Sequence, residues 1–164
     1  MNISNIHQRH YQCPQATLAT ILDSLASAND RLWPGEIWPP MRLNRGLEVG
    51  SRGGHGPIGY TVVDYLRGQS VVFSFTKPAS FQGTHGFEII ALDERRTLLR
   101  HSIVMTVNWR GLLLWASAIR WLHDALLEDA LDKVDRQLSG QPGASRHGLW
   151  VRFLRRVLGR GKKK

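Results

Sequence analysis

The spacing of hydrophobic residues predicts a strand followed by a helix at the start of the chain. Residues 3–11 alternate loosely with a period of two, which is typical of a strand. After Pro14, residues 15–28 carry apolar side chains at i, i+3, i+4 and i+7, which predicts an amphipathic helix. Residues 29–43 hold two Trp-Pro pairs, so we expect an ordered loop or short helical turns whose tryptophans pack on the core.

The middle of the chain contains β-type runs without helical periodicity. We expect strands at residues 47–49, 58–66, 70–76, 84–92 and 97–107. Turn residues at 67–69 and 93–96 separate neighbouring runs. Connections this short require antiparallel pairing, because a parallel crossover needs about a dozen residues or more.

Residues 111–138 form the longest helical pattern in the chain. One mostly apolar stripe is expected to face the core; it consists of Leu112, Ala116, Ile119, His123, Leu127, Ala130, Val134 and Leu138. The acidic residues of the segment fall beside or opposite this stripe. Residues 139–143, Ser-Gly-Gln-Pro-Gly, are expected to end the helix and act as a linker.

This order of elements predicts an α+β domain. A curved antiparallel sheet and one long C-terminal helix bury their apolar faces against each other, and we expect a cavity between these two layers. We assign residues 1–139 to this ligand-binding domain and residues 140–164 to a basic tail. The length of 164 residues fits such a domain organisation.

Charge and composition change this picture only at the C-terminus. The formal net charge is +9, but residues 140–164 contain eight Lys or Arg and no Asp or Glu, so the body is nearly neutral. The basicity therefore does not indicate a nucleic-acid-binding domain. The single Cys13 cannot form an internal disulfide, no signal segment is recognisable, and the apolar segment 111–122 is too short to span a membrane. We expect a cytoplasmic protein.

The tail pattern predicts a basic amphipathic helix. Its apolar face consists of Leu149, Trp150, Phe153, Leu154, Val157 and Leu158, and arginines surround this face. Such a helix suits an anionic membrane surface or an acidic partner protein, so peripheral attachment at the inner membrane is expected. The expected contact residues are Trp150, Arg152, Phe153, Arg155 and Arg156. The alternative is a terminal helix that packs on the domain and leaves its basic end in solvent.

The glycine-rich stretch from Gly53 to Tyr60 contains a G-x-G-x-x-G match. A dinucleotide-binding loop needs a helix directly after its glycines, whereas a β-type run begins here at Ile58. Pro57 also removes an amide that would face a phosphate. We therefore interpret the glycines as a bend between strands, with positive φ or close backbone approach, and expect no cofactor.

Several short motifs, taken together, resemble one protein family. They are Trp38-Pro-Pro-Met-Arg-Leu43, VGSRGGHGPI at 49–58, Tyr60-Thr-Val62, Val72-Phe-Ser-Phe75, Gly83-Thr-His-Gly-Phe-Glu88, Leu99-Arg-His101 and LHDALLED at 122–129. As a set over residues 3–138 they resemble a bacterial branch of the SRPBCC superfamily, the helix-grip group of START domains, polyketide cyclases and birch-pollen-allergen-like proteins. The resemblance implies a curved antiparallel sheet that grips the C-terminal helix around a ligand cavity. It does not imply one chemistry, because the fold hosts lipid carriers, cyclases, hydrolases and non-catalytic binders.

The histidines within these motifs are the main candidates for a site. His123 lies on the core-facing stripe, either as a structural histidine with a hydrogen-bonded ring or as a group that lines the cavity. His101 alternates with apolar residues of its strand and is expected to point inward. The register of the hairpin stays open: a loop with an odd number of residues places His85 opposite His101, and a four-residue loop places Glu88 there.

The expected function is to bind a small hydrophobic or amphipathic ligand in the internal cavity, in a carrier or accessory role. The candidate ligand-binding residues are Trp38, His55, Tyr60, His85, His101 and His123, with Trp38 and Tyr60 as rim or wall groups. One alternative is an enzyme similar to a polyketide cyclase, dehydratase or hydrolase. His85, His101 or His123 would then be catalytic, because a pKa of about 6.5 lets one ring give and another take a proton. A further alternative is a membrane-docked accessory or lipid-transport protein that acts through the tail.

No metal site is expected, because local spacings such as H-x-x-x-H and C-x-x-C are absent. In the run from His123 to Asp129, Glu128 and Asp129 do not share the helix face of His123. We expect these two carboxylates to lie in solvent. Arg120 and Asp124 are expected to form an i, i+4 pair, with Asp124 as a local partner only.

Overall fold

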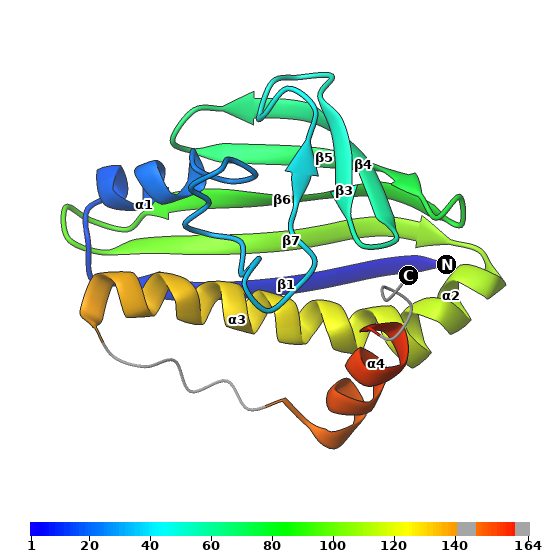
Figure 1. Cartoon of the computed structure of the whole chain (residues 1–164). Helices are drawn as coiled ribbons and strands as arrows, with labels where there is room; N and C mark the ends of the chain where they lie inside the picture. Colours follow the sequence, from blue (N-terminus) through cyan, green and yellow to red (C-terminus); the bar gives the residue numbers. More distant parts are fainter. Residues whose placement is uncertain (141–146, 160–164) are drawn as a thin grey trace.

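One curved antiparallel sheet forms the body of the protein. The computed structural model describes residues 1–140 and 147–159. Within them, seven strands lie in the order β1-β7-β6-β5-β4-β3-β2 (Figure 1). Their bounds are β1 Asn2–Tyr11, β2 Arg42–Leu43, β3 Arg52–His55, β4 Ile58–Leu66, β5 Ser70–Lys77, β6 Phe81–Ala91 and β7 Thr97–Val107.

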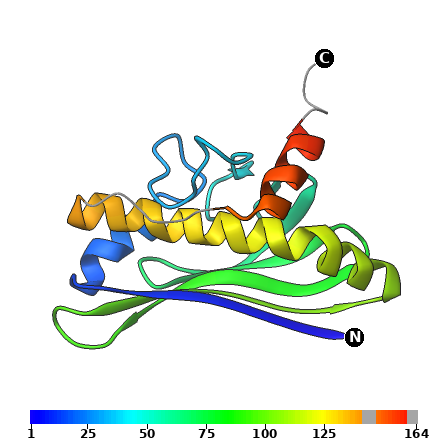
Figure 2. The same ribbon diagram turned by 90° about the horizontal axis from the view of Figure 1, so that it is seen from below.

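A long helical segment covers one face of this sheet (Figure 2). It consists of α2 Trp109–Leu114, a π-helical turn at Trp115–Ile119 and α3 Arg120–Ser139, and it ends at Gly140 with a left-handed φ of 69°. The short helix α1 (Gln15–Leu22) packs near one end of the sheet, and α4 (Leu149–Gly159) lies beside α3. None of the helices in residues 1–140 and 147–159 is both long and apolar enough to cross a membrane. The fold is therefore α+β, with the curved sheet wrapped against the long C-terminal helix, as the sequence predicts.

Most strands follow the predicted bounds, and the differences have local causes. The first helix stops at Leu22, because residues 23–27 form single turns and Ala26 takes a φ of 60°. The strand expected at 47–49 is wrong: these residues form turns, and β3 falls within the glycine-rich stretch instead. The π-helical turn shifts the helix face by one position, so Trp115 is buried in the core and Ala116 is exposed.

The glycines of the G-x-G-x-x-G match allow strands to approach closely. A Cβ on Gly53 would lie 1.8 Å from the carbonyl oxygen of Arg42, and one on Gly54 would lie 2.1 Å from that of Ile58. Gly56 has a φ of 54° at the first of the two residues that turn β3 into β4. The stretch is thus a tight hairpin, which agrees with the predicted bend.

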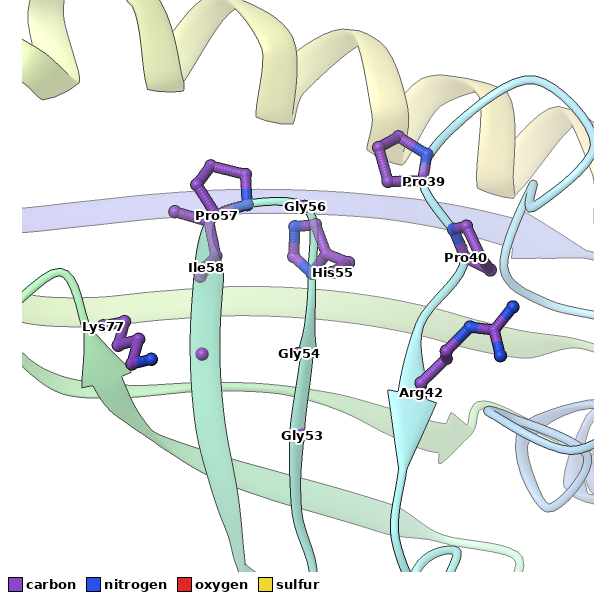
Figure 3. Close-up of a pocket in the computed structure, with 11 residues that line it drawn as sticks. Pro39, Pro40, Arg42, Gly53, Gly54, His55, Gly56, Pro57, Ile58 and Lys77 are labelled. Carbon is purple, nitrogen blue, oxygen red and sulfur yellow. The ribbon is translucent and has the colours of Figure 1, made fainter. Parts of the chain in front are cut away.

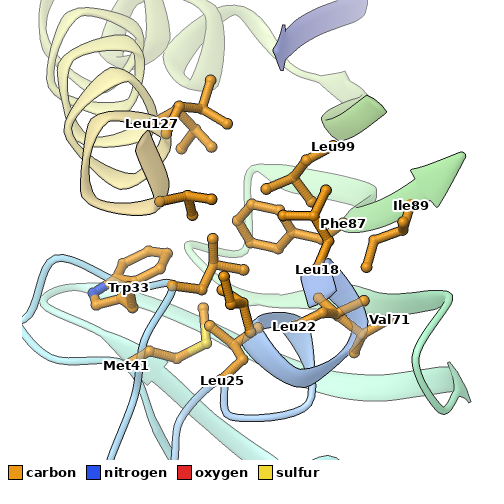
Figure 4. Close-up of a cluster of buried hydrophobic side chains, with 14 of the residues drawn as sticks. Leu18, Leu22, Leu25, Trp33, Met41, Val71, Phe87, Ile89, Leu99 and Leu127 are labelled. Atoms are coloured by element: carbon orange, nitrogen blue, oxygen red, sulfur yellow. The ribbon is translucent and has the colours of Figure 1, made fainter. Parts of the chain in front are cut away.

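Two clusters of buried apolar side chains lie between the helices and the sheet. The larger cluster joins α1, α3, the central strands and the loop after α1, whose Trp33, Trp38 and Met41 are buried (Figure 4). The smaller cluster lies under α2 and the π-helical turn and consists of Phe81, Ile103, Met105, Val107 and Trp115. Histidine side chains from β6, β7 and α3 contact residues of both clusters.

Candidate functional site

A row of polar rings crosses the inner face of the sheet. The register of β6 and β7 pairs Phe87 with His101 and His85 with Ile103, so both alternatives for the hairpin were wrong. His85 and His101 are instead diagonal neighbours on the same face, with ring centroids 5.7 Å apart. The inward orientation expected for His101 is confirmed, because its side chain is buried.

The row extends to both sides of this pair. Towards the far strands, the His85 ring lies 4.8 Å from that of Tyr60, and His55 Nδ1 lies 3.1 Å from the Tyr60 hydroxyl oxygen. Towards the edge of the sheet, β1 places His7 directly opposite His101. Across these five strands the row therefore reads His55, Tyr60, His85, His101 and His7.

His123 joins the row from the helix side. Its ring centroid lies 5.1 Å from that of His101 and 5.7 Å from that of His7. The side chain is 12% exposed, so His123 faces the sheet as its place on the apolar stripe predicts. Six polar rings from five strands and one helix thus meet in the interior.

Three of these histidines lack hydrogen-bond partners among the described residues. The ring nitrogens in question are His85 Nε2, His101 Nδ1, His123 Nδ1 and His123 Nε2. His85 is held between the rings of Phe73 and Phe75, with centroids 5.0 and 4.7 Å away, which fixes its orientation. Because an unsatisfied buried polar group costs about 1–3 kcal/mol, the row is poorly explained as a purely structural feature.

The same burial keeps the inner rings neutral. Burial lowers the pKa of His85 and His101 well below the ordinary value, and it lowers that of His55 to about 3. Burial also lowers the pKa of His123, although the nearby Asp124 acts in the opposite direction. At neutral pH each of these rings therefore carries one N–H donor and one acceptor nitrogen.

The outer end of the row is charged and fully paired. His7 Nδ1 lies 2.9 Å from Glu128 Oε1, and His7 Nε2 lies 3.0 Å from Asp124 Oδ1. Burial alone would lower the pKa of His7, but these hydrogen bonds outweigh it and raise the pKa. Burial would raise the pKa of Asp124, but the nearby His123 ring, with Nδ1 3.6 Å from Asp124 Oδ1, and hydrogen bonds from His7 and Asn5 outweigh it and hold that pKa below its ordinary value.

Arg9 continues this charged network along α3. Its guanidinium donates to Glu128 Oε2 at 2.8 Å, to Asp132 Oδ1 at 2.5 Å and to Asp135. The carboxylates that were expected beside or opposite the core stripe therefore face β1, because α3 runs along this edge strand (Figure 1). Asp124 therefore has two kinds of partner. His7 is a long-range partner, and Arg120, whose Nε lies 3.6 Å from Asp124, is the local partner that was predicted.

Asp129 is buried, and the expectation that it lies in solvent was wrong. Its Oδ2 accepts hydrogen bonds from Trp38 Nε1 at 2.7 Å and from His147 Nε2 at 2.8 Å. Glu128 is half-exposed but engaged by His7 and Arg9. Trp38 and Tyr60 are both buried, so they belong to the wall of the core and not to its rim.

One group of side chains has the composition of a metal site. Ligand atoms of His7, His123 and Asp124 lie within 4.8 Å of one another. Both ring nitrogens of His7 are already engaged by carboxylates, however, so a metal would have to displace a hydrogen bond and a proton. The arrangement fits an ion-pair network better than a metal centre.

His55 connects the row to a pocket of about 390 Å³ at the surface (Figure 3). The pocket lies over the β3–β4 hairpin, between Arg42 on β2 and Lys77 at the end of β5. Its lining contains these two cations and no acidic residue. A second pocket of about 660 Å³ adjoins it and shares Pro40, Arg42 and Gly53.

The tail residues divide into two groups. Val151 and Leu154 of α4 are buried, whereas Trp150, Phe153 and Val157 are exposed. Arg152 and Arg156 also point to solvent, but Arg155 turns back onto the domain. Its guanidinium lies 4.4 Å from the centre of the Trp38 ring and donates to the carbonyl oxygen of Ile37. Arg155 is therefore not part of the exposed face, and Arg160 and the terminal lysines lie outside the described residues.

Sequence reasoning missed His7 and Arg9, although a signal was present. With the alternation of β1 taken strictly, Asn5, His7, Arg9 and Tyr11 share one face, and this face turns out to be the inner one. The pairing of β1 with β7 then places His7 beside His101. Two adjacent ionisable residues on the inner face of an edge strand would have indicated partners on the covering helix.

Comparison with known proteins identifies the fold. No protein-family model and no curated protein matches the chain. Among solved structures, a Thermobifida fusca protein has a TM-score of 0.64 at 12% identity, over 88% of this chain and 99% of that one. CalU16 from Micromonospora echinospora has a TM-score of 0.59 at 13% identity, over 96% and 84%. Norcoclaurine synthase from Thalictrum flavum, in complex with dopamine and hydroxybenzaldehyde, has a TM-score of 0.63 at 11% identity, over 86% and 90%.

These likenesses show a helix-grip fold. The curved sheet and the long C-terminal helix of this chain match the arrangement in those neighbours. The identities lie far below the level at which a shared activity follows, so the comparisons establish the fold alone.

Proposed function

We propose that this protein binds a small amphipathic molecule between α3 and the sheet, with the polar groups of the molecule at the row of rings. The observation that carries this proposal is a set of four buried nitrogens on His85, His101 and His123 that have no hydrogen-bond partner among the described residues. A ligand with hydroxyl, carbonyl or amine groups would supply the missing hydrogen bonds. The role is that of a carrier or an accessory binding protein.

The surroundings of the row favour an amphipathic ligand over a fully polar one. Apolar side chains of both core clusters lie on either side of the histidines. A binding site with apolar walls and a few converging polar groups is the usual form for small-molecule recognition. The fold is able to hold such molecules, since the norcoclaurine synthase neighbour is a complex with dopamine and hydroxybenzaldehyde.

His55 marks the side from which the ligand would reach the interior. Its ring belongs both to the surface pocket and, through Tyr60, to the row. Arg42 and Lys77 flank that pocket without an acidic residue in its lining, which favours ligands with an anionic outer end. Trp33 packs on His55 with ring centroids 4.6 Å apart, so the loop after α1 would adjust when a ligand passes.

Native mass spectrometry of the protein isolated from its own host tests this proposal. We expect a retained small molecule that is released on denaturation and that is absent from His85→Leu and His101→Leu. His10→Leu is the matched control, because His10 lies on β1 but faces solvent. Retention of the same molecule by all variants would contradict the proposal, and so would an empty protein that no small amphipathic molecule stabilises in a thermal-shift screen.

Proton transfer on the bound molecule is a second candidate function. His101 and His123 are neutral and close together, and His101 Nδ1 has no hydrogen-bond partner among the described residues, so the His101 ring is able to take a proton from the ligand and return it at another atom. This chemistry is of the kind that cyclisation, dehydration or isomerisation requires. Deuterium incorporation into the ligand from heavy water would measure it: His101→Gln should stop incorporation while the ligand stays bound.

A further inference from the structure

A row of exposed apolar side chains runs along the outer face of the helical segment. Trp109 and Leu113 are each 61% exposed and Trp121 is 46% exposed, and Ser117 lies between them at the same spacing. Leu114 adds a further exposed side chain to this face. Single exposed apolar residues are ordinary, but a contiguous set of large ones marks an interaction surface.

Helix α4 enlarges this surface. Trp150 Nε1 donates to the carbonyl oxygen of Ser117 at 3.0 Å, which places the Trp150 indole in the middle of the row. Phe153 stacks on Trp150 with ring centroids 5.4 Å apart, and Val157 follows one helical turn later. We name this combined set, Trp109, Leu113, Leu114, Trp121, Leu149, Trp150, Phe153 and Val157, the tryptophan surface.

The exposure of these side chains is not a consequence of a loosely attached α4. The helix already buries Val151 and Leu154. Arg155 and His147 fix it further through Trp38 and Asp129. Because α4 satisfies its packing with one face, the aromatic residues on its other face remain available to a partner outside the domain.

Four arginines lie beside the tryptophan surface. Arg110 lies over the Trp109 ring at 5.1 Å and Arg120 over the Trp121 ring at 5.8 Å. Arg152 and Arg156 are exposed on α4. The sequence has no Asp or Glu from Arg95 to His123 or from Arg136 to Lys164. Two copies of the chain would therefore bring like charges together, whereas an anionic surface would complement them.

We propose that the tryptophan surface docks on membranes that contain anionic phospholipids. Tryptophan favours the boundary between headgroups and acyl chains, and arginines beside it pair with lipid phosphates. Each Lys or Arg close to an anionic membrane strengthens binding by about fivefold. The domain would lie with α2, the π-helical turn and α4 against the bilayer. This inference does not depend on the ligand proposed above, because it uses different residues.

Vesicle co-sedimentation of the full chain tests the proposal. The probes are vesicles of phosphatidylcholine alone and vesicles of phosphatidylcholine and phosphatidylglycerol in equal amounts. We expect binding only to the second kind, a blue shift of tryptophan fluorescence, and a loss of about tenfold or more in affinity for Trp109→Ser/Trp121→Ser and for Arg110→Glu/Arg120→Glu. Ile6→Ser/Val104→Ser is the matched control, since these exposed apolar residues lie on the sheet. It should change affinity less than twofold.

Several results would overturn the proposal. The first is equal binding to both kinds of vesicle, or binding to neither. The second is full binding by Trp109→Ser/Trp121→Ser together with loss of binding in Lys162→Ser/Lys163→Ser/Lys164→Ser, which would assign the contact to the terminal lysines alone. The third is a concentration-dependent dimer that the tryptophan variant abolishes, which would identify a second copy as the occupant. Thermal melting of each variant verifies that it is folded.

Discussion

Two sets of polar side chains meet α3 in different ways. His7 and Arg9 form a paired set with carboxylates of α3, in which each charged group has a partner of opposite sign. His85, His101 and His123 form an unpaired set between two apolar clusters, with ring nitrogens that have no hydrogen-bond partner in the part of the chain that the structure describes. The paired set explains how the edge strand is fixed to the helix. The unpaired set lowers the stability of the fold, because no hydrogen bond among the described residues offsets the burial of its nitrogens. We therefore assign function to it.

Acid should destabilise the protein mainly through the inner histidines. The folded-state pKa values of His55, His85 and His101 lie below the unfolded value of about 6.5. Their contribution to the free energy of unfolding is therefore complete above pH 6.5 and is lost as the pH falls below it. Well below pH 6.5, each of these rings lowers the free energy of unfolding by about 1.4 kcal/mol for every pH unit. Urea unfolding between pH 7.5 and about pH 5 measures this slope.

The opposite sign is expected for His7. The folded-state pKa of His7 is raised, so its contribution to the free energy of unfolding is complete below pH 6.5 and is lost as the pH rises through that raised value.

The acid slope assigned to the inner histidines has its own test. A His85→Phe/His101→Leu variant should lose less stability per pH unit below pH 6.5 than the wild-type chain. If the stability of this variant depends on pH as steeply as that of the wild-type chain, the inner rings are protonated in the folded protein, which would contradict their neutral state.

Removal of Arg9 should have the largest effect of any single substitution in the paired set. Arg9→Met takes the guanidinium from three carboxylates, one of which belongs to the buried Asp132. We expect a loss of about 3–5 kcal/mol in the free energy of unfolding. Arg100→Met is the matched control, because Arg100 pairs with Glu88 in a partly exposed position and should cost about 0–1 kcal/mol. Similar losses for both variants would remove the distinction between buried and exposed pairs.

Replacement of one histidine from each set should give effects of opposite sign. His7→Leu leaves Asp124 and Glu128 without their shared partner and should cost about 2 kcal/mol at pH 6. His101→Leu removes an unsatisfied polar group from the core and should raise the stability of ligand-free protein by about 1 kcal/mol. Chemical unfolding of both variants decides the point. Destabilisation by His101→Leu would indicate that the ring is satisfied in the ligand-free protein.

The smallest effect is expected at the exposed end of the paired set. Arg120 Nε lies 3.6 Å from Asp124 on the same helix, and the Arg120 side chain is mostly in solvent. Arg120→Ala should therefore change the free energy of unfolding by only about 0.3–0.5 kcal/mol. A loss several times larger, measured by thermal unfolding, would show that Arg120 belongs to the network of His7 and Arg9.

The sequence was sufficient for the fold because the fold follows from local periodicity. The alternation in residues 58–66 and 97–107 and the long helical stripe define the sheet and its covering helix without long-range information. The glycine-rich hairpin was also recognisable as a turn. The π-helical turn was not, because a shift of one residue within a helix leaves no clear mark in the hydrophobic pattern.

The site was only partly accessible from the sequence. His101 and His123 could be placed inward from the side-chain periods of a strand and a helix. Their distance could not be predicted, because it depends on the β6–β7 register, which residues 92–96 set by pairing Ala91 with Thr97. The pairing of His7 with α3 depends in addition on where the helix crosses the sheet. The place and angle at which α3 crosses the sheet follow from packing of the whole core.

Asp129 has a practical consequence for how the tail is studied. The same carboxylate oxygen accepts hydrogen bonds from Trp38 in the loop after α1 and from His147 in the segment before α4, and Arg155 lies over the Trp38 ring. A chain shortened after Ser139 would lose two neighbours of that tryptophan together with its own basic charges. Such a truncation would disturb the wall of the interior and the outer surface at once, so the two are separable only by point substitution.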